Sequence, residues 1–160
     1  MHSVSKVGGQ DEEWTPGRVE QRVIEWADTL WRLTDREHGW IYGQKTFWPE
    51  TLREIQDVFS NAVENDGKHE DMLPPRLPAT SQAVDHFYET SEWFLWLPDI
   101  RDRRIVTAVA DWLRRPYARI NWYFVQRVSG VFLHPRTMRR LYLNALCDIA
   151  RQLNHRASRP

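Results

Sequence analysis

The stretch that decides the fold is RINWYFVQRVSGVFLHPRTMRRLYLNALCDIARQLN, residues 119–154. Asn121 is a good N-cap residue, so a short helix is expected to begin directly after it. Its apolar face consists of Trp122, Val125 and Val128. Gly130 stands where the chain must turn, because glycine adopts a positive φ at little cost. The stretch therefore begins with a short helix that ends in a glycine turn.

A long basic helix is expected after this turn. Pro135 suits its first position, since the N–H that proline lacks would have no partner there. Apolar residues then recur at spacings of three and four and form one stripe: Met138, Leu141, Tyr142, Ala145, Leu146, Ile149 and Leu153. The polar residues that fall off the stripe are expected to face outward: Arg136, Thr137, Arg139, Arg140 and Asn144. A helix, a glycine turn and a basic helix are the arrangement of a helix-turn-helix DNA-binding motif, which we expect over residues 119–157.

The composition is that of a soluble globular chain. Of 160 residues, 41% are hydrophobic and 28% are charged, and nine are tryptophan. No apolar run is long enough to cross a bilayer, and the N-terminal MHSVSKVGGQDEEW lacks the apolar centre of a signal peptide. We therefore expect a cytoplasmic protein with no membrane contact. Cys147 is the single cysteine, which excludes an internal disulfide, and we expect it to be a small core residue.

The charge is zero overall but strongly polarised along the chain. Residues 1–98 hold 9 Lys and Arg against 18 Asp and Glu, a net charge of −9. Residues 99–160 hold 13 Arg against 4 Asp, a net charge of +9. A basic segment of this size favours a nucleic-acid surface at the C-terminal end. The acidic segment is a candidate surface for a protein partner.

The remaining sequence predicts an all-α fold, a bundle of about six helices with the helix-turn-helix at its C-terminus. Thr15 and Pro16 predict the start of the first helix, with a buried face of Val19, Val23, Trp26, Ala27, Leu30 and Leu33. A second helix is expected over 49–63. A third is expected over 81–97, capped by Thr80 or Ser81, with a face of Val84, Phe87, Tyr88, Ser91, Phe94 and Leu95. A fourth is expected to begin at Asp99 or Asp102 and to end before Pro116.

The predicted domain organisation follows from composition. Residues 1–13 are polar and are predicted to be a disordered tail. Residues 14–64 form an acidic helical N-terminal region, and residues 65–80 form a proline-rich linker, because Pro74, Pro75 and Pro78 exclude a helix interior. Residues 81–160 form the helical domain that carries the helix-turn-helix. Trp26, Trp112 and Trp122 are expected in the core.

The sequence contains no recognisable catalytic or metal-binding constellation. The six histidines are His2, His38, His69, His86, His134 and His155. No pair of them has a metal-ligand spacing such as HExxH, and no cysteine pair can join them. The chain has no GxSxG elbow, P-loop or GxGxxG motif. We therefore predict that the protein is not an enzyme and binds no metal or cofactor.

The candidate binding site is instead a set of polar residues around the basic helix. Arginine can bridge guanine O6 and N7 in the major groove or bind phosphate. Arg119 and Arg127 are expected to contact phosphate, and Arg136, Thr137, Arg139 and Arg140 are expected to lie nearest the bases. Asn144 can add a hydrogen bond. The predicted partner is double-stranded DNA.

The sequence leaves an alternative function and the state of assembly open. The first is a non-catalytic protein-interaction module with a degenerate helix-turn-helix, whose basic helix docks on an acidic surface, either that of its own N-terminal region or that of a partner. The second concerns assembly. A homo-oligomer would suit either a dimeric regulator on a palindrome or a DNA-packaging ring.

Four motifs along the C-terminal half carry a family resemblance: WFLWLPDIRDRRIV (93–106), NWYFVQRVSG (121–130), RTMRRLYLNAL (136–146) and RQLN (151–154). Through them, residues 81–154 resemble a phage- and prophage-encoded helix-turn-helix family of proteobacteria, largely uncharacterised. The N-terminal WTPGRVEQRVIEWADTLWRL and the Phe47-Trp48-Pro49 step also fit it. The resemblance implies DNA binding in phage biology, as a small-terminase-like packaging factor or a transcriptional regulator.

The chain departs from that family pattern in the turn. The usual turn is Gly, an apolar residue, Ser, two residues and Thr, whereas VFLHPR separates Gly130 from Thr137 here and is two residues longer. We expect an open turn with Phe132 and Leu133 packed inward. Gln126 is a second departure, since such helices often carry a small residue at this position for close packing.

Overall fold

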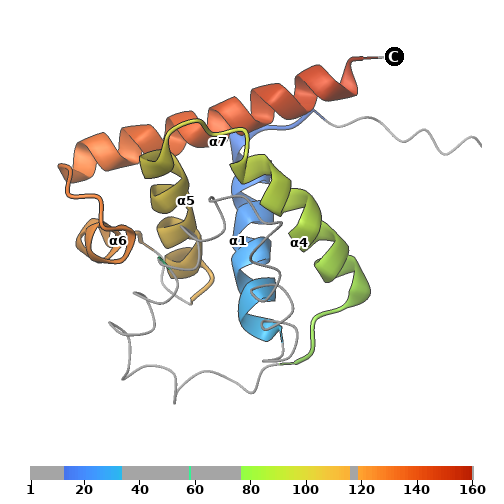
Figure 1. Ribbon diagram of the computed structural model, residues 1–160, viewed down its shortest axis with the longest axis horizontal. Coiled ribbons are helices and arrows are strands. Elements are labelled where there is room, and N and C mark those ends of the chain that lie inside the picture. Colours follow the sequence, from blue (N-terminus) through green and yellow to red (C-terminus); the bar gives the residue numbers. More distant parts are fainter. Residues whose placement is uncertain (1–12, 34–57, 59–76, 116–118, 160) are drawn as a thin grey trace, which may run out of the picture.

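The computed structural model describes residues 13–33, 58, 77–115 and 119–159. These residues form five α-helices and no strand, which confirms the all-α class (Figure 1). The helices are α1 (Pro16–Arg32), α4 (Ser81–Phe94), α5 (Ile100–Leu113), α6 (Trp122–Ser129) and α7 (Pro135–Ala157). Of the helix predicted over 49–63 only Val58 is described, and it is helical and buried. The predicted tail up to residue 12 and the linker up to residue 76 lie outside the described residues.

Side-chain caps begin α1, α4 and α5 where the sequence places them. The Thr15 hydroxyl accepts a hydrogen bond from the Arg18 N–H at 3.3 Å, directly before Pro16. Thr80, rather than Ser81, caps α4. Asp99, rather than Asp102, caps α5. Each cap satisfies an N–H that the first helical turn would otherwise leave without a partner, so these boundaries follow from local chemistry.

The helices are arranged as a row that is crossed by the longest one. Figure 1 shows α6, α5, α1 and α4 in that order, with α7 lying across them. Helix α1 packs against α4, α5 and α7, and α5 packs against α6 and α7. The C-terminal end of α7 lies at the opposite side of the molecule from α6 (Figure 1). Helix α1 is therefore central to the packing.

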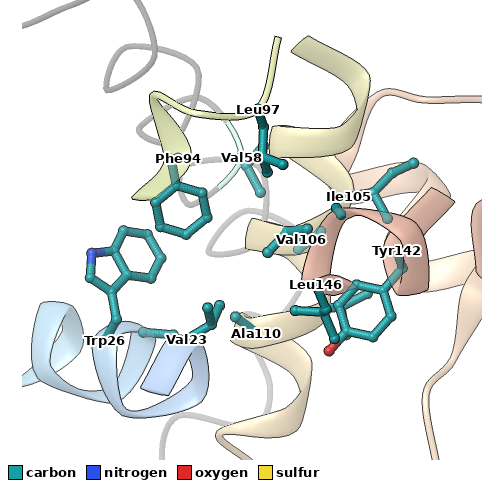
Figure 2. Packing of buried hydrophobic residues seen from close by; sticks show 14 of the residues in the cluster. Val23, Trp26, Val58, Phe94, Leu97, Ile105, Val106, Ala110, Tyr142 and Leu146 are labelled. Atoms are coloured by element: carbon teal, nitrogen blue, oxygen red, sulfur yellow. The ribbon is translucent and has the colours of Figure 1, made fainter. Parts of the chain in front are cut away.

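The core forms where α1 meets the other helices. Val23 and Trp26 project from α1 towards Phe94 of α4, Ala110 of α5 and Leu146 of α7 (Figure 2). The Trp26 side chain is only 1% exposed, and its ring lies 4.8 Å from that of Phe94. Truncating a buried tryptophan to alanine costs about 3–5 kcal/mol. All six residues predicted for the buried face of α1 are confirmed as buried.

Polar contacts fix both ends of the α1 segment to the C-terminal helices. The backbone N–H of Trp14 donates to Asn154 Oδ1 at 2.7 Å, and Asn154 Nδ2 donates back to the Trp14 carbonyl at 2.9 Å. At the other end, Trp31 Nε1 donates to Asp111 Oδ1 of α5 at 2.9 Å. Each contact joins residues 80 or more positions apart in the chain, so these bonds hold the tertiary arrangement rather than a local turn.

The third helix is shorter than predicted, and its buried face is different. Helix α4 ends at Phe94, and residues 95–97 form a turn before Pro98. Leu95 therefore leaves the helical period and is half exposed, and Tyr88 is also exposed. Trp93 takes the interior position instead, with its ring 5.3 Å from that of Trp14. The predicted face was wrong at Tyr88 and Leu95 because α1 covers a different side of α4.

Three other predictions of burial need correction. Cys147 is exposed and is not a core residue, because it lies on the side of α7 that faces away from α5 and α1. Trp112 and Trp122 are only half-buried. The Trp112 indole N–H reaches the Arg119 carbonyl at 2.8 Å, so its polar edge stays near the surface. No helix in the described ranges is long and apolar enough to cross a membrane.

Candidate nucleic-acid interface

Helix α6 has one buried side and one exposed side. Asn121 Oδ1 accepts hydrogen bonds from the N–H groups of Tyr123 and Phe124 at 3.1 and 3.2 Å and so begins the helix as predicted. Val125 is buried at the side that packs on α5. Tyr123 and Arg127 lie one turn apart, and both are exposed. An aromatic ring and a guanidinium thus share the outer side of this helix.

The connection from α6 to α7 is held by several hydrogen bonds. Gly130 has a φ of 69° and ends α6 in the left-handed conformation. Arg104 Nη1 of α5 donates to the Ser129 carbonyl at 3.2 Å. Gln126 Nε2 donates to the Leu133 carbonyl, and the Val131 N–H donates to Ser129 Oγ at 3.2 Å. The side chain of Gln126 therefore helps to hold the connection between α6 and α7 in place.

The packing of this connection differs from the prediction. Val131 is buried and Leu133 is half-buried, but the Phe132 side chain is 79% exposed. The prediction that Phe132 packs inward was wrong. The left-handed turn at Gly130 sends Val131 into the core, so the next side chain points the other way. An aromatic ring is consequently displayed between the two helices.

Helix α7 begins at Pro135, as predicted, with His134 as its cap. The His134 ring Nδ1 accepts from the Arg136 N–H at 3.2 Å. The His134 carbonyl accepts from the Thr137 N–H at 2.8 Å. Because these bonds fix the first turn of α7, the arginines that follow leave the helix from a defined position.

The outer face of α7 carries the predicted basic residues. We define this face as the exposed residues Arg136, Arg139, Arg140, Leu143, Asn144 and Cys147. At 3.6 residues per turn they lie within about 140° of the helix circumference. Arg136 and Asn144 are eight residues apart, or about 12 Å along the axis. That length is close to the width of the DNA major groove, about 12 Å.

The exposed arginines at this end of the molecule have no acidic partner in the described structure. Within the residues described, Arg119, Arg127, Arg136, Arg139 and Arg140 form no ion pair. Between Asp111 and Asp148 the sequence contains no carboxylate side chain at all. The formal charges within residues 112–147 are therefore all positive.

The carboxylates of α1 are engaged elsewhere. Glu20 accepts a hydrogen bond from the Tyr142 hydroxyl at 2.6 Å. Glu25 lies 3.2 Å from the His86 ring nitrogen, and Asp28 pairs with Arg32 at 2.7 Å. In the described part of the acidic N-terminal region, none of these groups neutralises the outer face of α7.

Arginines in other places have structural roles. Arg114 and Arg115 each approach the fully buried Asp111 carboxylate at 2.8 Å. Arg151 pairs with Asp148 at 3.0 Å, and the Arg156 guanidinium lies 4.1 Å from the centre of the Trp96 ring. Each of these arginines contacts a carboxylate or an aromatic ring, which distinguishes them from Arg119, Arg127, Arg136, Arg139 and Arg140.

All seven predicted site residues lie on segments gathered at one end of the molecule, where α6, the connection and the first turns of α7 meet (Figure 1). Arg119, Arg127, Arg136, Arg139, Arg140 and Asn144 are exposed, and Thr137 is half-buried. Sequence reasoning missed the exposed aromatic rings of Tyr123 and Phe132. The position of Tyr123 opposite the apolar face of α6 was the available signal, whereas Phe132 lies in a turn without periodicity.

Comparison with protein-family models, with curated proteins and with solved structures finds no match in any of the three. Among the described side chains, no three His, Cys, Asp or Glu gather as metal ligands.

Proposed function

We propose that the protein binds double-stranded DNA through a helix-turn-helix formed by α6 and α7. The observation that carries the proposal is the row of exposed arginines on the outer face of α7, which have no ion pair to any described carboxylate. A helix inserted into the major groove presents its N-terminal residues to the base edges. Arg136, Arg139 and Arg140 hold those positions, and Thr137 and Asn144 add hydrogen-bonding groups.

The arginines outside α7 have a different part in this proposal. Arg119 precedes α6 and Arg127 lies in its last turn, so both flank the inserted helix rather than enter the groove with it. Flanking cations bind phosphates and set the register of the protein on the duplex without specifying sequence. The proposed site thus combines phosphate contacts from α6 with base contacts from α7.

The test is a duplex-binding titration at about 50 mM and about 200 mM salt. Each phosphate contact contributes about −0.9 to the slope of log affinity against log salt, so the phosphate contacts of Arg119 and Arg127 give a slope of about −1.8 and a loss of affinity of about 12-fold between the two salts. Arg119→Ala/Arg127→Ala should reduce the slope by about 2. Arg136→Ala/Arg140→Ala should instead lower duplex affinity at both salts, by about 1–3 kcal/mol for each lost base contact. Absence of salt-dependent binding by the wild type overturns the proposal, as does equal binding by the Arg136/Arg140 variant.

The matched control removes the same charge at the C-terminal end of α7 and just after it. Arg151 and Arg159 are exposed near the C-terminus of α7, far from α6 (Figure 1). Arg151→Ala/Arg159→Ala should therefore leave the salt slope of duplex binding unchanged. A loss of affinity equal to that of the Arg136/Arg140 variant means that any exposed arginine contributes alike and that no specific face is used.

Only the resemblance to the phage-encoded helix-turn-helix family indicates a biological role for this binding. A transcriptional regulator that binds a palindrome requires a dimer, because the two-fold symmetry of the site mirrors that of the protein. A packaging factor of the small-terminase kind assembles as a ring. The mass of the protein in solution, measured with and without duplex, distinguishes a dimer from a ring.

A further inference from the structure

Two aromatic side chains at the arginine-rich end are conspicuous for their exposure. The Phe132 side chain is 79% exposed and that of Tyr123 is 72% exposed. Phe132 lies in the connection between α6 and α7, and Tyr123 lies in the first turn of α6. Single exposed apolar residues are common on protein surfaces. Tyr123 and Phe132 differ from such single residues in the rings and charges around them.

The other described aromatic residues all have a partner. Each of them contacts another aromatic ring or lies against a guanidinium. Tyr123 and Phe132 take part in no such contact among the residues that the structure describes. The molecule therefore offers two unpartnered ring faces, both near the exposed arginines of α6 and α7.

The charge around these rings selects the kind of partner. A second copy of the chain docked through the same surface would place arginines opposite arginines, since a two-fold interface is self-complementary. Such like-charge contacts are strongly unfavourable. A partner with dense negative charge and flat apolar rings matches both features, and nucleic acid has that composition.

The exposed rings of Tyr123 and Phe132 also indicate which form of nucleic acid, paired or unpaired, fits this surface better. An intact duplex displays base edges in its grooves, but its base faces are covered by neighbouring bases. Unpaired nucleotides expose those faces, and aromatic side chains stack on them without strong sequence preference. A phenylalanine has no hydrogen-bonding group with which to read an edge. Exposed rings beside a basic helix thus suit unpaired bases better than paired ones.

The chain connectivity places Phe132 close to the proposed duplex contacts of α7. Phe132 is four residues before Arg136, so the two Cα atoms are at most about 14 Å apart. This distance corresponds to about four nucleotide steps of 3.4 Å. An unpaired segment that reaches Phe132 must therefore adjoin the duplex held by α7.

We propose that Phe132 and Tyr123 stack on unpaired bases next to the duplex bound by α7, so that the protein prefers a junction between double- and single-stranded DNA. This inference rests on the proposed duplex binding and adds the form of DNA that is recognised. The arginines contact the duplex, and the two rings contact unpaired bases and no phosphate. Ring removal should consequently lower affinity without altering its salt dependence.

The experiment compares three hairpin duplexes: one blunt, one with a single-stranded thymidine tail, and one with an abasic tail of equal length and charge. The wild type should bind the thymidine tail at least about tenfold more tightly than the abasic tail, because each stacked base contributes a factor of about 5 to 150. Phe132→Ala/Tyr123→Ala should bind both tailed hairpins as the wild type binds the abasic one. Its salt slope should be unchanged.

Two conservative variants identify the contact. Phe132→Leu keeps apolar bulk without an aromatic ring and should lose its share of the tail preference, whereas Tyr123→Phe keeps the ring and should retain it. Full retention of the preference by Phe132→Leu overturns the stacking proposal. Equal wild-type binding to the two tails also overturns it, and salt-dependent binding to the blunt hairpin then shows that the proposed duplex binding stands.

Two parallel measurements test whether this surface binds a protein or a lipid membrane instead. If the wild type is a dimer and Phe132→Ala/Tyr123→Ala is a monomer, the rings form a protein interface and the proposal fails. If the rings are needed for binding to vesicles that contain phosphatidylserine but not for tail preference, the partner is a lipid surface and the proposal fails. If the wild type does not bind the blunt hairpin, the proposed duplex binding itself fails.

Discussion

Tyr142 shows how a single side chain links the proposed DNA-binding helix to the core. Its hydroxyl donates a hydrogen bond of 2.6 Å to Glu20 of α1, and its ring is buried among the residues of Figure 2. Tyr142→Phe should lower the free energy of unfolding at pH 7 by about 1–3 kcal/mol, because the lost bond has a charged acceptor. Urea denaturation measures this. Tyr123→Phe is the control and should have no effect, since that hydroxyl is exposed.

The same residue predicts a dependence on alkaline pH. Burial, followed by the hydrogen bond and charge of Glu20, raises the pKa of Tyr142 above its usual 10.0. The folded state therefore keeps the proton while the unfolded state loses it, so this stability is complete below about pH 10 and declines above it by about 1.4 kcal/mol per pH unit. Tyr142→Phe has no proton to lose, and its stability deficit should narrow above pH 10. A constant deficit across that range would contradict this linkage.

At the scale of the element, Gly130 controls the boundary between α6 and α7. Its φ of 69° is costly for any residue with a Cβ, although the space itself is open, with Arg104 Nη1 3.5 Å from an added Cβ. Gly130→Ala should lower the unfolding free energy by about 1–2 kcal/mol. Gly17→Ala in α1 should instead raise it by about 0.5–1 kcal/mol, because Gly17 has no positive φ and no close neighbour. Shifts of the same sign in urea denaturation would contradict this account.

The elements also show what sequence can and cannot predict. Caps at Thr15, Asp99 and Asn121 were predictable because each depends on one side chain and the next few backbone N–H groups. The stripe of α7 was predictable from its period. The exposure of Phe132 was not, because it depends on the left-handed turn and on Val131 occupying the adjacent interior position. The buried face of α4 was also beyond local reasoning, since the placement of α1 decides it.

For the whole molecule, the opposite charges of the two segments do not correspond to two separate cores. Helix α1 belongs to the acidic segment, yet its apolar side chains belong to the same buried cluster as those of α4, α5 and α7. The polar contacts of Trp14, Glu20 and Trp31 add connections from α1 to α5 and α7. The basic surface at the α6 end is therefore supported by a helix that carries no part of it.

This dependence predicts that residues 81–160 do not fold as an independent domain. A chain of residues 77–160 lacks α1, so the sides of α4, α5 and α7 that α1 covers would be exposed to water. We expect such a chain to lose cooperative thermal unfolding and to bind a hydrophobic dye. In the full-length protein, Trp26→Ala should be milder, with a loss of about 3–5 kcal/mol in unfolding free energy and a cooperative transition. If the shorter chain melts sharply and binds duplex with the wild-type salt slope, the C-terminal helices form a domain of their own, and α1 is an addition to it.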